Sequence, residues 1–153
     1  PIQTEEIMPD PPQTAISIGT FELSQILRQY FPEGSLHLGD ADYKLMSLED
    51  AQRFVAWYTP QVKESEYTPD NRDCENFAFE MTGKALRWSN WEYVWIYTWS
   101  QSDEGKYIFP NHGFCGVLAE NRIVYFCDPL RVAAPKGKLI PAYPVKSYVT
   151  LVF

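Results

Sequence analysis

The hydrophobic pattern changes its period at Trp91, and this change constrains the fold more than any other feature of the sequence. Before Trp91, apolar residues recur at spacings of three and four, which is typical of amphipathic helices. From Trp91 onward, aromatic residues take every second position, which is typical of a β-strand. These residues are Trp91, Tyr93, Trp95, Tyr97 and Trp99. We therefore expect helices in the first part of the chain and a sheet in the second.

Three helices are predicted before Trp91. They follow Thr20, Ser47 and Asp73, each of which is a residue type that commonly precedes a helix. The spacing of Ser47 and Asp50 resembles a capping box with Asp in place of Glu. In the third helix Cys74 shares a face with apolar residues, so its side chain is expected to point toward the protein interior.

The strand at 91–99 is followed by four further predicted strands. They span residues 106–109, 112–118, 123–127 and 147–153. Helices first and strands second predict an α+β fold with N-terminal helices packed on an antiparallel β-sheet. Residues 1–19 are rich in proline and are expected to form an N-terminal arm, and residues 20–153 to form a single domain.

Composition narrows the classes of partner. The net charge of −7 over 153 residues argues against binding to nucleic acid and to anionic membranes. No stretch approaches the roughly 20 apolar residues of a membrane span. We therefore expect a soluble protein that is cytoplasmic by default, although a removed secretion signal would leave no trace in this sequence.

The cysteines suggest one chemically distinct thiol. There are three and no C-x-x-C pair, so we predict neither a disulfide scaffold nor a metal site. Cys115 and Cys127 are interpreted as packing thiols. Cys74 differs because it opens a helix, where the positive end of the helix dipole favours a thiolate.

The chain contains, in this order, a possible nucleophile, a base and an orienting carboxylate. They are Cys74, His112 and Asp128. His112 and Asp128 lie on either side of the turn at 120–122. An odd-numbered turn there would put both side chains on one face of neighbouring strands, whereas a two-residue turn would separate them.

Three segments resemble the papain-like and transglutaminase-like cysteine peptidase superfamily. They are residues 67–78 around Cys74, the strand that begins at His112, and Asp128-Pro129 at the end of the next strand. The resemblance is to small bacterial and phage domains and to the protease domain of fungal agglutinins. Two departures are Asp128, where the agglutinin type tends to have Glu, and Gly113, where alanine is expected.

The resemblance implies a papain-like or transglutaminase-like core and a hydrolase, namely a thiol protease or amidase with a Cys74, His112 and Asp128 catalytic triad. A peptide or protein substrate would form a thioester with Cys74. No cofactor is expected, and calcium is implied by the resemblance alone. The reaction also needs donors for an oxyanion, for which Asn71 and Gln52 are candidates besides the backbone N–H of Cys74.

A rival hypothesis starts from the aromatic strand. Trp91, Trp95 and Trp99 could form a stacking platform for a sugar or an extended peptide. The chain would then be a non-catalytic carbohydrate- or peptide-binding module. A third hypothesis is an inactive peptidase fold that serves as an interaction domain.

Overall fold

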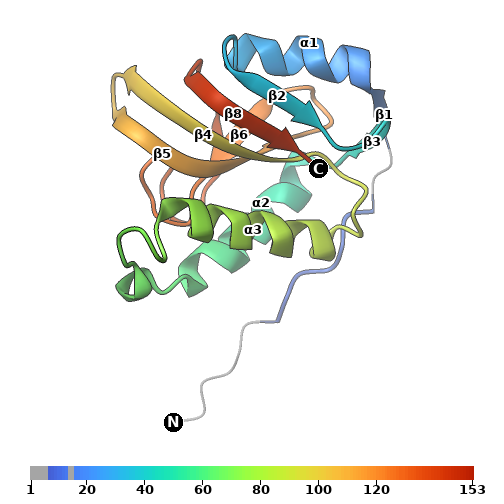
Figure 1. Cartoon of the computed structure of the whole chain (residues 1–153). Coiled ribbons are helices and arrows are strands. Elements are labelled where there is room, and N and C mark those ends of the chain that lie inside the picture. The colour runs from blue at the N-terminus through green and yellow to red at the C-terminus, as the bar shows by residue number, and fades with distance from the viewer. Residues whose placement is uncertain (1–6, 14–15) are drawn as a thin grey trace.

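A six-stranded sheet runs through the computed structural model, which describes residues 7–13 and 16–153 (Figure 1). Its strands lie in the order β2, β8, β4, β5, β6, β7. Their bounds are β2 Ser35–Leu38, β4 Trp95–Glu104, β5 Tyr107–Leu118, β6 Val124–Cys127, β7 Ile140–Pro141 and β8 Lys146–Val152. A separate antiparallel pair consists of β1 (Ile16–Gly19) and β3 (Asp42–Leu45).

The three predicted helices are confirmed. They are α1 (Thr20–Tyr30), α2 (Leu48–Tyr58) and α3 (Cys74–Trp88), and two short 3₁₀ helices, η1 (Thr59–Gln61) and η2 (Glu64–Glu66), lie between α2 and α3. The Ser47 side chain accepts a hydrogen bond from the Asp50 N–H at the start of α2. Asp73 and Asn76 form a capping box at the start of α3.

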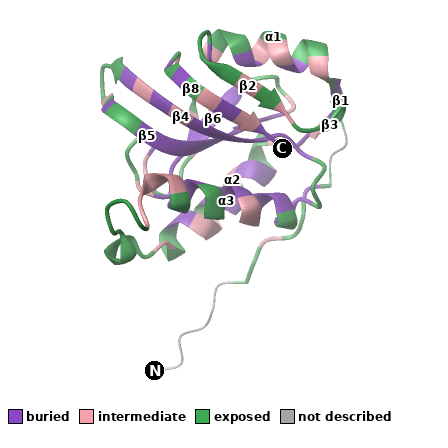
Figure 2. Cartoon of the chain, viewed as in Figure 1, coloured by how far each residue is buried: buried purple, intermediate pink, exposed green. Residues whose placement is uncertain are grey.

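The helices lie on both faces of the sheet. Helices α2 and α3 cover one face and α1 covers the other (Figure 1). Strand β4 is consequently buried on both sides, with Trp95 and Tyr97 facing α2 and α3 while Ile96 faces α1. The central strands are buried along much of their length (Figure 2). This explains why the region from 94 to 98 is almost continuously apolar in sequence.

The predicted fold class needs correction. Strands account for more of the chain than the three α-helices do, and three of those strands precede Trp91, in the part of the chain that was predicted to contain the helices. The sheet is mixed, because β2 pairs parallel to β8. Helix α1 packs on the face opposite α2 and α3. The expected papain-like or transglutaminase-like core, with N-terminal helices on an antiparallel sheet, is therefore replaced by a mixed-sheet fold with more strand than helix.

Part of the predicted arm at 1–19 belongs to the fold. Residues 16–19 form β1, and Trp88 at the end of α3 donates a hydrogen bond to the Pro9 carbonyl at 2.8 Å. Residues 1–6 and 14–15 lie outside the described residues. Within the described part of the chain, no helix combines the length and the apolar character needed to span a membrane.

Candidate functional site

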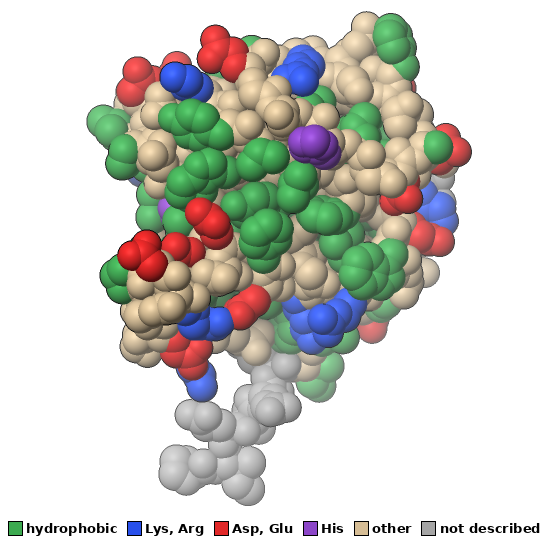
Figure 3. Space-filling model, in the orientation of Figure 1, with side chains coloured by type: hydrophobic (Ala, Val, Ile, Leu, Met, Phe, Trp, Pro, Cys, Tyr) green, Lys and Arg blue, Asp and Glu red, His purple; other side chains and the backbone are tan. Residues whose placement is uncertain are grey.

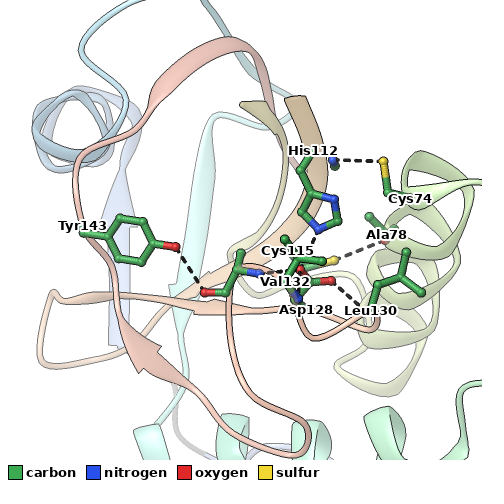
Figure 4. A network of polar contacts seen from close by, with 10 residues as sticks. Cys74, Ala78, His112, Cys115, Asp128, Leu130, Val132 and Tyr143 are labelled. Atoms are coloured by element: carbon green, nitrogen blue, oxygen red, sulfur yellow. Dashed lines mark hydrogen bonds and ion pairs between the residues drawn. The ribbon is translucent and has the colours of Figure 1, made fainter. Parts of the chain in front are cut away.

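Cys74 lies at the first position of α3, beside strand β5. Its side chain is half-buried, and the Gly113 N–H donates to its Sγ at 3.4 Å (Figure 4). The helix start and this amide both present positive partial charge to the sulfur. The sulfur of Cys74 therefore faces polar backbone groups rather than an apolar core.

His112 and Asp128 are in direct contact. Nε2 of His112 lies 2.6 Å from Oδ2 of Asp128, and both side chains are buried. They meet because β5 and β6 pair with Cys115 opposite Cys127 and Leu118 opposite Val124. This is the register of an odd-numbered turn, and Arg122 completes the turn in the left-handed conformation with φ of 63°.

The loop after β6 holds the Asp128 carboxylate in place. Oδ1 accepts a hydrogen bond from the Leu130 N–H at 2.8 Å, and Oδ2 accepts from Val132 at 3.1 Å and Ala133 at 2.8 Å. Burying a carboxylate is costly unless its oxygens are hydrogen-bonded, and here three backbone amides and one imidazole supply the bonds. The loop thus fixes the oxygen that faces His112.

The imidazole of His112 lies between Asp128 and Cys74 (Figure 4). Burial disfavours its charged form, but the hydrogen bond to Asp128 and the neighbouring Cys74 thiol outweigh burial and raise the pKa of His112 from 6.5 to about 9. A thiol beside an imidazole that is held by a carboxylate can pass its proton to the ring. The arrangement can therefore form a thiolate and imidazolium pair.

The structure explains why glycine stands at position 113, where alanine was expected from the family resemblance. A Cβ at this position would lie 3.2 Å from the Glu75 Cα and 3.3 Å from the Tyr97 hydroxyl. Strand β5 can approach the first turn of α3 this closely only because residue 113 has no side chain. Glycine thus places its own N–H against Cys74.

Cys115 and Cys127 are packing thiols, as predicted. Both are free and buried, and Cys115 donates to the Ala78 carbonyl at 3.3 Å. Burial raises the pKa of Cys115 to about 12 and that of Cys127 well above its usual value. Among the described residues, no group of three or more His, Cys, Asp or Glu side chains is arranged to hold a metal ion.

The two candidate oxyanion donors lie in different places. Gln52, on α2, donates to the Gly137 carbonyl at 2.7 Å and accepts from the Leu139 N–H at 3.0 Å. Both polar atoms of its side chain are therefore engaged with the loop at 137–139. Asn71 is exposed in the turn that precedes α3, where its N–H donates to the Thr68 carbonyl.

The three tryptophans of the predicted platform do not share one surface. Trp95 is fully buried and donates to the Ser89 hydroxyl at 3.1 Å. Trp99 is half-buried at the edge of the core under α3. Trp91 is 60% exposed and precedes β4, with a left-handed φ of 62°.

Trp91 borders a shallow cleft of about 420 Å³, which we call the Trp91 cleft. Its other walls come from β1, the loop before β3, β3 itself, and Glu92, which follows Trp91 in the chain. They include Ser17, Asp40, Asp42, Lys44 and Glu92. Lys44 forms an ion pair with Glu92 at 2.9 Å, while the Asp40 N–H donates to the Tyr43 hydroxyl. An exposed indole thus lies beside several polar groups.

Sequence reasoning missed the backbone groups of the candidate site. The amides of Gly113, Leu130, Val132 and Ala133 carry no side-chain signature. The Asp128-Pro129 pair was a usable signal, because Asp before Pro favours a turn in which the carboxylate accepts nearby amides. The Trp91 cleft was missed because it depends on strands that were not predicted.

Comparison of the sequence with protein families and with curated proteins returned no match. Two solved structures share the fold. One, described as the PSL1a-E64 complex, has a TM-score of 0.62 and 15% identity over 88% of this chain and 50% of that chain. The other, Polyporus squamosus lectin bound to the human-type influenza-binding epitope Neu5Aca2-6Galb1-4GlcNAc, has a TM-score of 0.61 and 16% identity over 88% of this chain and 49% of that chain. This chain therefore spans about half the length of each.

These neighbours correct the predicted family and activity. Neither description names a papain-like or transglutaminase-like peptidase, and one names a lectin with a bound glycan. The assignment to that peptidase superfamily, and with it the prediction of a thiol protease or amidase acting on a peptide substrate, is therefore not retained. At 15% and 16% identity the likeness concerns the fold alone.

Proposed function

We propose that this chain is a carbohydrate-binding module and that the Trp91 cleft holds the sugar. The observation that carries the proposal is the exposed indole of Trp91 at the edge of a cleft with polar walls. The apolar face of a sugar ring can stack on an indole while its hydroxyl groups bind the neighbouring carboxylates and lysine. The fold likeness to a structure described as a lectin with a glycan supports the same class of ligand.

The backbone at Trp91 holds the indole outward. Asn90 and Trp91 both have left-handed conformations, with φ of 59° and 62°. The Trp91 N–H donates to the Leu86 carbonyl at 2.9 Å, so the end of α3 fixes this strained turn. A bulky residue with positive φ is unusual, and such strain is concentrated at functional sites.

Calorimetric titration with the neutral disaccharide Galb1-4GlcNAc tests the proposal, because this unit is part of the glycan that the lectin neighbour binds. Trp91→Ala should weaken binding by about tenfold or more, since it removes the stacking surface. Phe21→Ala is the matched control, because Phe21 is an exposed aromatic residue on α1 outside the cleft. Equal affinity of wild type and Trp91→Ala would refute the site, and no binding of any saccharide, neutral or acidic, would refute the function.

A second candidate concerns the thiol. We propose that Cys74, His112 and Asp128 act as one unit that makes Cys74 the reactive cysteine of the chain. The contact between His112 and Asp128, with the Gly113 amide on the sulfur, supports it. This proposal concerns thiol reactivity and includes no substrate or turnover.

Alkylation by iodoacetamide, mapped by mass spectrometry, tests this candidate. Cys74 should react rapidly below about pH 7, and His112→Ala should slow it. Cys115 and Cys127 are internal controls, because both are buried. E64, named in the description of one structural neighbour, is a second probe: an adduct on Cys74, absent in Cys74→Ala, would support the unit. Equally slow reaction of all three cysteines would refute it.

A further inference from the structure

A second cleft, larger than the Trp91 cleft, has a volume of about 530 Å³ and lies between the end of α2, the 3₁₀ helices η1 and η2, and α3. We call it the Trp57 cleft. Trp57, Tyr58 and Phe77 supply its aromatic surface. The same cleft holds five charged side chains, so it combines flat apolar walls with groups that can bind a polar ligand.

The carboxylates of the Trp57 cleft are already paired. Arg72 contacts Glu66 at 3.2 Å and Glu80 through two nitrogens at 2.5 and 3.0 Å. Its guanidinium also lies over the Phe77 ring, with Cζ 4.7 Å from the centroid. Arg72 therefore balances much of the negative charge on this wall.

The lysines of the Trp57 cleft have no such partner. Neither Lys63 nor Lys84 forms an ion pair with a carboxylate within residues 7–13 and 16–153, and Lys84 Nζ lies 5.8 Å from the Trp57 ring centroid. Both acidic and basic side chains are present in the region of α3 in Figure 3. In a chain with a net charge of −7, a cleft that holds an indole and two lysines, neither of which is in an ion pair among the described residues, is electrostatically unusual.

We propose that the Trp57 cleft binds a sugar ring that carries a carboxylate. The ring lies against the Trp57 indole, and the carboxylate lies between the ammonium groups of Lys63 and Lys84. This inference rests on the proposed carbohydrate-binding function and adds a ligand class. The Trp91 cleft cannot share that class, because Asp40, Asp42 and Glu92 would repel an acidic sugar there.

Glucuronate and glucose are the probes, because they differ only in having a carboxylate or a hydroxymethyl group at one carbon. The double variant Lys63→Met, Lys84→Met should bind glucuronate about tenfold more weakly than wild type and glucose equally well. Wild-type affinity for glucuronate should also fall as salt is added, since both lysines are near the surface. Lys106→Met, at the tip of the β4–β5 hairpin, is the matched control, and circular dichroism checks that each variant is folded.

Three results are informative. Loss of glucuronate binding in the double variant but not in Lys106→Met supports the inference. Glucuronate binding that the double variant retains and Trp91→Ala loses overturns the inference while leaving the carbohydrate-binding function intact. If neither glucuronate nor any neutral saccharide binds, both the inference and the proposed function are overturned.

Discussion

At Gly113 strand β5 approaches the start of the helix that carries Cys74 closely. Gly113→Ala would put a Cβ 3.2 Å from the Glu75 Cα, which belongs to the backbone and cannot rotate away. We expect a loss of about 1–3 kcal/mol in the free energy of unfolding, because overpacking must be relieved by shifting the first turn of α3. Urea denaturation measures this loss.

The control for Gly113, which lies on β5, is Gly83 on α3. A Cβ at Gly83 would meet nothing within 4 Å. Gly83→Ala should therefore stabilise the protein by about 0.5–1 kcal/mol through its higher helix propensity. If Gly113→Ala proved as harmless as Gly83→Ala, the close approach of β5 to α3 would be disproved.

The raised pKa of His112 leads us to expect that the free energy of unfolding depends on pH. Its pKa is raised from 6.5 to about 9 in the folded protein, so the folded state binds the proton more tightly than the unfolded state. The stabilisation is therefore complete below the unfolded pKa and is lost as pH rises through the folded pKa. Urea denaturation should show that the free energy of unfolding of the wild type falls between about pH 6 and about pH 9.5. The fall should be smaller in His112→Gln.

Cys74→Ala separates the causes of that shift. Both Asp128 and Cys74 raise the pKa of His112, so removing the sulfur should lower it while the Asp128 contact remains. The chemical shift of the imidazole protons against pH, measured by NMR, reports the value directly. An unchanged pKa in Cys74→Ala would mean that the thiol and the imidazole do not interact.

At the scale of elements, Gln52 joins α2 to the loop at 137–139. It donates to Gly137 and accepts from Leu139, so Gln52→Ala removes two hydrogen bonds from a partly buried site. We expect a loss of about 1–2 kcal/mol in stability. Gln61→Ala, which removes one exposed bond to the Trp57 carbonyl, should cost less than about 0.5 kcal/mol. Equal effects would mean that other contacts hold the loop.

The elements also show what the sequence can predict. The helices at 48 and 74 are evident because capping residues and a helical period agree there. The helix at 20 is evident from its period alone, because its N-cap is Gly19, which has no side chain to cap it. Strand β2 has four half-buried or exposed residues, and its partner β8 lies more than a hundred residues away. Too few alternations fit in so short a strand to reveal the period, and its pairing depends on tertiary contacts. The pairing of β2 could therefore not be predicted from the sequence, and the same holds for the Trp91 cleft, which β1 and β3 line.

Unlike the clefts, the candidate thiol site can be recognised in part from the sequence. Cys74, His112 and Asp128 can be connected from sequence because one turn length decides whether two of them share a face. The donors that surround them belong to the backbone, and the close approach at Gly113 arises only when α3 packs on β5. The side chains of the candidate thiol site can thus be identified in the sequence. The backbone N–H groups that face them are brought into place only by the packing of the fold.

At the scale of the whole molecule, the N-terminal segment packs far from the candidate thiol. Pro9 accepts a hydrogen bond from Trp88, at the opposite end of α3 from Cys74, and α3 has 15 residues, so the two ends are about 21 Å apart. Removing residues 1–13, which spares β1, should therefore leave the rate of Cys74 alkylation unchanged. It should lower the free energy of unfolding by about 1 kcal/mol, because the Trp88 indole N–H loses its partly buried acceptor.

Trp88→Phe tests the origin of that loss, since it removes the N–H donor and keeps an aromatic ring. Suppose that the hydrogen bond to Pro9 accounts for the stabilising effect of the segment. The loss in free energy of unfolding when the truncation and Trp88→Phe are combined, measured by urea denaturation, should then be smaller than the sum of the two separate losses. Additive losses would place the contribution of the segment elsewhere, for instance at buried Pro12. Faster alkylation of Cys74 in the truncated chain would contradict the arrangement seen here, because it would require the segment to cover the start of α3 rather than its end.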